Sequence, residues 1–96
     1  MAKLFRTNGI VEVVSPKNGS KFTAKELQRF VGGWLEAVGV FNNSVFAICD
    51  EDGKLKNKPL NPLATILARN LYMMEGLQFR DHFVGDVIFV SKNEID

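Results

Sequence analysis

The chain has 96 residues, with 46% apolar residues, 24% charged residues and a formal net charge of +1. These values are typical of one folded domain, which we expect to span residues 1–96, and they exclude a disordered chain. A charge so close to neutral also excludes a general attraction for nucleic acid or for an anionic membrane. We therefore expect neither of these as a partner.

The cysteine count and the length of the apolar runs restrict which covalent or metal sites the chain can form and where in the cell it can act. Cys49 is the single cysteine, so no internal disulfide and no cysteine-based zinc site can form. No apolar run approaches the roughly 18 residues of a membrane span, and no signal-peptide core is present. The sequence predicts a buried, inert thiol and a cytoplasmic protein without a cofactor.

Residues 2–14 are predicted to form a β-hairpin. Asn8-Gly9 is the preferred pair for a two-residue turn in which both residues need positive φ. Apolar residues stand on both sides of this pair. The turn-forming residues 15–20 then end the second strand.

The first helix has the clearest local signature in the chain. Thr23 and Glu26 have the spacing of a capping box, and Phe22 and Leu27 have that of a hydrophobic staple. Gly32-Gly33 is expected to end the helix, because glycine takes the left-handed cap conformation without strain. One apolar face is predicted from the helical spacing of four residues: Leu27, Phe30, Val31 and Trp34.

Two strands are predicted next, over 34–41 and 45–49. The second is almost continuously apolar, which indicates an internal strand with both faces covered. Residues 50–53 should form a tight turn. Residues 54–56 are predicted to be a short edge strand whose lysines protect the edge.

The second helix is expected to begin with Asn61 as its cap and Pro62 as its first residue. Gly76 should end it, residues 86–91 should form a last strand, and residues 92–96 should be a loose tail. The buried stripe of this helix is predicted from five apolar residues: Leu63, Ile66, Leu67, Leu71 and Met74.

The element order ββ-α-ββ(β)-α-β predicts an α+β domain. We expect one mostly antiparallel or mixed sheet of about five strands, packed with two helices.

Three segments read together resemble a known family. They are 26–38 (ELQRFVGGWLEAV), 45–65 (VFAICDEDGKLKNKPLNPLAT) and 84–90 (VGDVIFV). Their order is similar to that in a family of small phage and mobile-element proteins catalogued as domain of unknown function 3846. The chain departs from the pattern in a longer Met- and Phe-rich segment over 71–83. The resemblance implies a phage-like setting in a bacterial cytoplasm, and it supplies no activity.

The connection over 50–62 holds the densest group of polar side chains. Its lysines precede the N-terminus of the second helix, where free N–H groups and the helix dipole favour an anion. One interpretation is a site for a nucleotide or another small anion, and the other is edge protection and solubility. The candidate ligand-binding residues are Lys54, Lys56, Asn57, Lys58 and Asn61.

Catalytic and metal-binding patterns are absent from the sequence. His82 follows Asp81, but adjacent side chains diverge and no nucleophile accompanies them, so we interpret it as a partly exposed loop residue. Residues 50–52 lack the spacing of a calcium loop and are interpreted as a solvated turn. Gly32-Gly33 ends a helix rather than opening one, so it is no phosphate loop. We expect no enzyme and no bound metal.

Residues 71–83 contain more large apolar groups than a loop requires. Some could fill the core, and others could form an exposed patch for a partner or for self-association. Trp34 and Tyr72 could stack on a base, although Trp34 is also assigned to the first helix's face. The candidate partner surface consists of Met73, Met74, Leu77, Phe79 and Phe83.

Two functions from different classes remain open. The first is a phage-type accessory module that binds a host protein or itself, for example to counter a host system. The alternative is a protein that binds or sequesters a small anion or a nucleotide signal.

Overall fold

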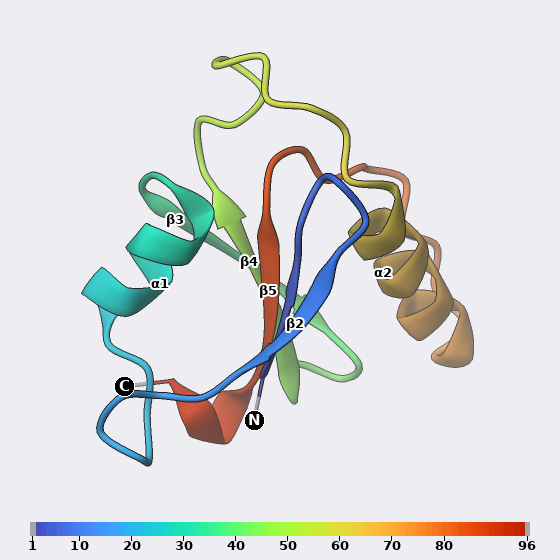
Figure 1. The fold of residues 1–96 in the computed structure, drawn as a ribbon. Coiled ribbons are helices and arrows are strands. Elements are labelled where there is room, and N and C mark those ends of the chain that lie inside the picture. The colour runs from blue at the N-terminus through green and yellow to red at the C-terminus, as the bar shows by residue number, and fades with distance from the viewer. Residues whose placement is uncertain (1, 96) are drawn as a thin grey trace.

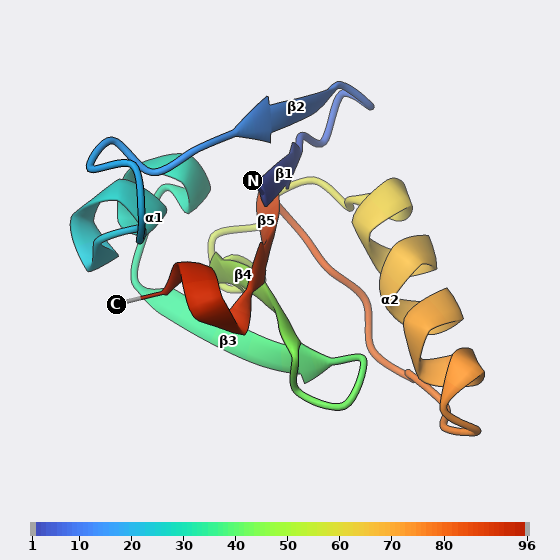
Figure 2. The ribbon, with the colours of Figure 1, turned by 90° about the horizontal axis from the view of Figure 1, so that it is seen from below.

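The computed structural model describes residues 2–95, and Figures 1 and 2 show a sheet with one helix on each face. The sheet has five antiparallel strands in the order β2-β1-β5-β4-β3. The predicted α+β fold is thereby confirmed. The elements are β1 (Ala2–Phe5), β2 (Val11–Val14), α1 (Ala24–Val31), β3 (Leu35–Val40), β4 (Val45–Asp50), α2 (Pro62–Met74), β5 (Val87–Ser91) and a 3₁₀ turn, η1 (Lys92–Glu94).

The central strand β5 supplies both cores of the domain. Ile88 and Val90 pack in the cluster beneath α1, while Val87 and Phe89 pack in the cluster beneath α2. Successive side chains of a strand point to opposite faces, so a continuous apolar run suits a strand covered on both sides. The same alternation runs along β4, which lies between β5 and β3 as an internal strand. Its predicted central position is confirmed.

The capping signals of α1 are confirmed. Thr23 Oγ1 accepts a hydrogen bond from the Glu26 N–H at 3.2 Å, and Glu26 Oε1 accepts one from the Thr23 N–H at 3.0 Å. Gly32 ends the helix with a φ of +77°. The assignment of Trp34 to the helix's buried face is wrong. Trp34 lies beyond the cap and is 68% exposed.

The β1–β2 hairpin is present, but its turn is not the predicted two-residue type. The Arg6 N–H donates to the Ile10 carbonyl at 2.9 Å, and the Gly9 N–H donates to the Arg6 carbonyl at 3.0 Å. Gly9 has a φ of +89°, whereas Asn8 does not have positive φ. This is the three-residue hairpin loop with glycine in the left-handed position.

The predicted edge strand over 54–56 is wrong. Residues 51–57 form successive turns, in which the Lys56 N–H donates to the Asp52 carbonyl at 2.9 Å and the Lys58 N–H to the Gly53 carbonyl at 3.0 Å. β3 is therefore the edge of the sheet on this side. The lysines have no strand of their own to protect.

The C-terminal residues 92–95 are not the predicted loose tail. Ser91 and Glu94 form a second capping box around η1, and the Glu94 carbonyl accepts a hydrogen bond from the Phe22 N–H at 2.7 Å. Ile95 packs against the core cluster beneath α1. Asp96 lies outside the described residues.

Candidate functional site

The connection that follows β4 is organised around a buried carboxylate, Asp50. Its side chain is 1% exposed, and its Oδ2 lies 2.8 Å from the Nζ of both Lys56 and Lys58. Burial by itself would raise the pKa of Asp50. Hydrogen bonds from the two lysines and from the Asp52 N–H outweigh burial and lower the pKa to about 2. The carboxylate is thus ionised and fully engaged inside the protein.

The Asp50 cluster also ends α1. Lys58 Nζ donates to the Val31 carbonyl at 2.8 Å, at the C-terminal end of that helix. A cation there satisfies a free carbonyl and complements the helix dipole. Lys56 and Lys58 therefore join the connection to α1 and β4. The interpretation of residues 50–52 as a solvated turn missed the burial of Asp50.

The predicted ligand-binding residues do not converge on one open site. Lys54 pairs with Asp81 at the surface, and Asn57 is exposed with a φ of +55°. Asn61 is 0% exposed. Its Oδ1 accepts from the Ala64 N–H at 3.2 Å, which confirms the predicted helix cap.

The amide nitrogen of Asn61 is committed as well. It donates to the Phe5 carbonyl at 2.8 Å and to the Gly85 carbonyl at 2.9 Å. These three bonds fasten the start of α2 to β1 and to the segment that leads into β5. The side chain of Asn61 therefore has a structural role, and none of its polar atoms is available to a ligand.

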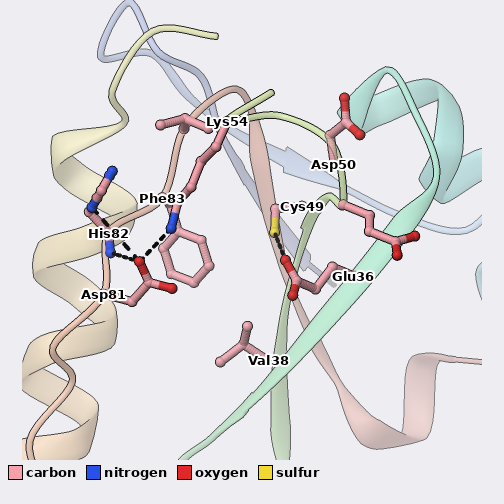
Figure 3. A pocket seen from close by; sticks show the side chains of 10 residues that line it. Glu36, Val38, Cys49, Asp50, Lys54, Asp81, His82 and Phe83 are labelled. Atoms are coloured by element: carbon pink, nitrogen blue, oxygen red, sulfur yellow. Dashed lines mark hydrogen bonds and ion pairs between the residues drawn. The ribbon is translucent and has the colours of Figure 1, made fainter. Parts of the chain in front are cut away.

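A small cavity of about 250 Å³ lies between the β3–β4 pair and the segment 81–84 (Figure 3). Cys49 Sγ lies 3.7 Å from Glu36 Oε1 on one wall. On another wall, Asp81 lies between Lys54 and His82, whose Nδ1 is 3.8 Å from the Asp81 carboxylate. Figure 3 shows these two groups on separate sides of the cavity.

The cavity lacks an activated nucleophile. Burial, and next the Glu36 carboxylate, raise the pKa of Cys49 to about 12, so the thiol stays protonated at neutral pH. The hydrogen bond from Lys54 lowers the pKa of Asp81 and occupies the carboxylate that could orient His82. Within residues 2–95, no three His, Cys, Asp or Glu side chains gather where they could hold a metal ion.

The helix α2 is turned away from its predicted orientation. Small or polar residues, Ala64, Thr65 and Ala68, are the buried ones. Leu67 and Leu71 of the predicted stripe are partly buried, but the rest of it faces solvent. The exposed members are Leu63 at 42%, Ile66 at 51% and Met74 at 70%.

Aromatic residues of the following segment explain this rotation of α2. Phe83 is 5% exposed and stacks on Phe79 with ring centroids 5.4 Å apart, and Phe79 in turn contacts Tyr72 at 5.1 Å. The Phe83 N–H also donates to Thr65 Oγ1 at 2.9 Å. These bulky rings lie beneath α2, so the helix presents its small residues to them.

The predicted partner surface is therefore divided by the structure. Phe79 and Phe83 belong to the core cluster beneath α2. Met73, Met74 and Leu77 are exposed at 68%, 70% and 53%. Tyr72, offered as a stacking residue, is half-buried and donates through its hydroxyl to the Gly39 carbonyl at 3.2 Å.

We use the name outer face of α2 for the exposed apolar side chains Leu63, Ile66, Met73 and Met74. Leu60, before the helix, and Leu77, after it, are each about half exposed. Arg69 is the one charged residue within α2, and it forms no ion pair with any part of the chain that the structure describes. Sequence reasoning assigned Leu63 and Ile66 to the core. The alanines at 64 and 68 were the signal for the true buried side.

A family model described as Domain of unknown function (DUF3846) matches residues 7–96. No curated protein and no solved structure matches the chain. Neither helix among the described residues has the length and apolar character needed to cross a membrane. The family match covers nearly the whole described fold, including both helices and the Asp50 cluster. The chain belongs to the family of the domain of unknown function DUF3846.

Proposed function

We propose that this protein is a non-enzymatic, phage-type accessory protein that binds a protein surface, of a second copy or of a host protein, through the outer face of α2. The proposed place of action is the cytoplasm of a bacterial host, as the family resemblance implies. Occupying a component of a host defence system is one form that such binding would take.

The observation that carries this proposal is the outward orientation of the large side chains of α2. Ile66, Met73 and Met74 are 51–70% exposed, on a helix with one charged residue in 13. Soluble domains rarely leave a contiguous apolar patch in water unless it meets a partner. Methionine is well suited to such a surface because its flexible thioether adapts to different shapes. The geometry therefore supports binding of a protein surface.

The same geometry offers less support for the alternative, a small-anion or nucleotide binder. Each predicted lysine already contacts a carboxylate of its own chain, Asp50 or Asp81. A nucleotide would have to displace these contacts, including two to a buried group. A ligand that binds only the native state raises the melting temperature. We expect a panel of mono-, di- and cyclic nucleotides to leave the melting temperature unchanged.

Site-specific photo-crosslinking in bacterial cells tests the proposal. A photoreactive residue placed at Ile66 or Met73 should give a protein adduct, whether the partner is a second copy or another protein. The matched control is Leu55, which is apolar and 84% exposed on the 51–57 turns. Adducts at all three positions alike, or at none of them, would contradict a binding role for α2.

A further inference from the structure

Four of the exposed residues of α2 have the spacing of a coiled-coil seam. Leu63, Ile66, Asn70 and Met73 are separated by three, four and three residues, and all four are exposed. This is the alternation of the a and d positions of a heptad, which lines up along one edge of a helix and packs against a second helix. Neither the sheet nor α1 requires such a pattern on a helix face that points to solvent.

The seam is not used within the domain. The buried residues of α2 are Ala64, Thr65 and Ala68, which lie on the other side of the helix and meet the aromatic core. Figure 2 shows α2 at the outside of the domain, with one side toward the sheet and the other side without a neighbouring element. The heptad side is therefore free for a helix from another chain.

Asn70 indicates which helix covers the seam. It stands in the middle of the seam, with Leu63 and Ile66 before it and Met73 after it, and its side chain bonds to no described residue. A purely apolar surface laid over the seam would leave this amide without a hydrogen-bond partner, which is unfavourable because the amide loses its water without a replacement. A second copy supplies a matching amide. A single asparagine in a seam is a known way of fixing register and oligomer state.

The net charge of the chain and the exposed apolar area around α2 are both compatible with a second copy as the partner. Within α2 the one charged residue is Arg69, beside the seam, and the chain has a net charge of +1, so two copies repel little. Six large side chains, Leu60 and Leu77 included, are 42–70% exposed. They leave on the order of 500 Å² per copy, so two copies together just reach the roughly 1,000 Å² that a specific interface requires in total. This size suits a weak, reversible dimer.

We propose that two copies of this chain pair through α2, with Asn70 of each copy hydrogen-bonded to its counterpart at a two-fold axis. This inference rests on the proposed function, because it names the partner of the outer face of α2. In a two-fold interface the same patch serves both copies, so Leu63 and Ile66 find apolar residues of the partner's α2 opposite them.

Sedimentation over a range from micromolar to millimolar concentration tests the pairing. The wild-type chain should shift from 10.7 kDa to twice that mass. Ile66→Glu should raise the dimer dissociation constant at least about tenfold, which corresponds to 1.4 kcal/mol. Leu55→Glu, at an apolar position that is exposed but lies outside α2, should leave it unchanged. A wild-type chain that stays monomeric throughout would overturn the inference.

The position of the axis is tested by charge complementation at residue 70. Asn70→Asp and Asn70→Lys should each dissociate at neutral pH, because like charges meet at the axis. An equimolar mixture should form a dimer again, since opposite charges then face each other. A dimer that tolerates both changes, or a mixture that stays dissociated while the wild type is dimeric, would exclude Asn70 from the axis.

These outcomes are separable from failure of the proposed function. If the chain is monomeric but a photoreactive residue at Ile66 still captures a different protein, the outer face of α2 binds a heterologous partner. In that case the dimer is wrong and the binding role is supported. If neither association nor adducts occur, both proposals fail together.

Discussion

Gly33 and Asp50 approach so closely that a Cβ atom on Gly33 would lie 2.4 Å from Asp50 Oδ1. Real Cβ atoms are not found at such a distance from an oxygen, so the absence of a side chain at residue 33 makes room for the carboxylate. The ion pairs that the buried Asp50 carboxylate forms with Lys56 and Lys58 occupy this space. One glycine after α1 therefore determines whether the 50–58 connection can close against the helix.

We predict that Gly33→Ala destabilises the protein by about 1–3 kcal/mol, the usual cost of overpacking. The added methyl group would displace the Asp50 carboxylate from its lysines. The measurement is the free energy of unfolding from denaturant titration. Asp50→Ala in the same chain removes the clash, so the double variant should lose less than the sum of the two single losses. Additive losses would show that the two residues are not coupled.

We predict that stability falls as the pH drops from about 4 toward 2. The folded-state pKa of Asp50 is lowered from 3.8 to about 2, so its contribution is fully present above pH 4. It is lost as the carboxylate takes up a proton. A depression of this size corresponds to roughly 2 kcal/mol.

Asp50→Asn is the control for this pH dependence. At neutral pH it should destabilise the fold by about 1–3 kcal/mol, because hydrogen bonds from two lysines to a buried carboxylate lose their charged acceptor. Between pH 4 and 2 it should lose less stability than the wild-type chain does, since the titrating group is gone. Parallel pH profiles of the two proteins would assign the acid sensitivity to other carboxylates.

The two residues of the α1 capping box are predicted to contribute unequally to the free energy of unfolding. Thr23→Ala should cost about 1 kcal/mol of unfolding free energy, the usual value for a lost N-cap. Glu26→Ala should cost more, because Glu26 accepts hydrogen bonds from the N–H of Thr23 and of Lys17, both at 3.0 Å. The comparison is made by denaturant titration of both variants. Equal losses would show that the bond from Lys17 contributes nothing measurable.

Local signals were the part of this structure that the sequence predicted well. The capping box at Thr23 and the Asn61-Pro62 start of α2 depend on nearest neighbours in the chain, and each is confirmed. Such patterns are decided by backbone hydrogen bonding over a few residues. Distant packing hardly changes them.

Two of the errors, in α2 and at Asp50, arose where tertiary contacts decide which side chains are buried. Leu63 and Ile66 have helical spacing, but the rings of Phe79 and Phe83 lie beneath α2 and leave room only for its small side. The burial of Asp50 depends on lysines six and eight residues further on and on a glycine before β3. No local pattern encodes the burial of Asp50, so the lysines were interpreted as a surface group.

The thiol of Cys49 should be unreactive in the native protein. It is 6% exposed and its pKa is raised to about 12, whereas the thiolate is the reacting form. At pH 8, a thiol reagent should modify Cys49 only as fast as the protein unfolds, and immediately in denaturant. Rapid modification under native conditions would mean that the cavity wall opens readily.

The orientation of α2 can be tested by comparing its two sides. Ala68 is 0% exposed beneath the helix, so Ala68→Leu should overpack the aromatic core and cost about 1–3 kcal/mol of unfolding free energy. Met74 is 70% exposed, so Met74→Gln should change stability by no more than about 0.5 kcal/mol. Both variants keep a residue compatible with a helix, which isolates the effect of packing. The predicted stripe of large residues would require the opposite ranking, with tolerance at 68. Denaturant titration at low protein concentration, where any dimer is dissociated, makes this comparison independent of the pairing proposed above.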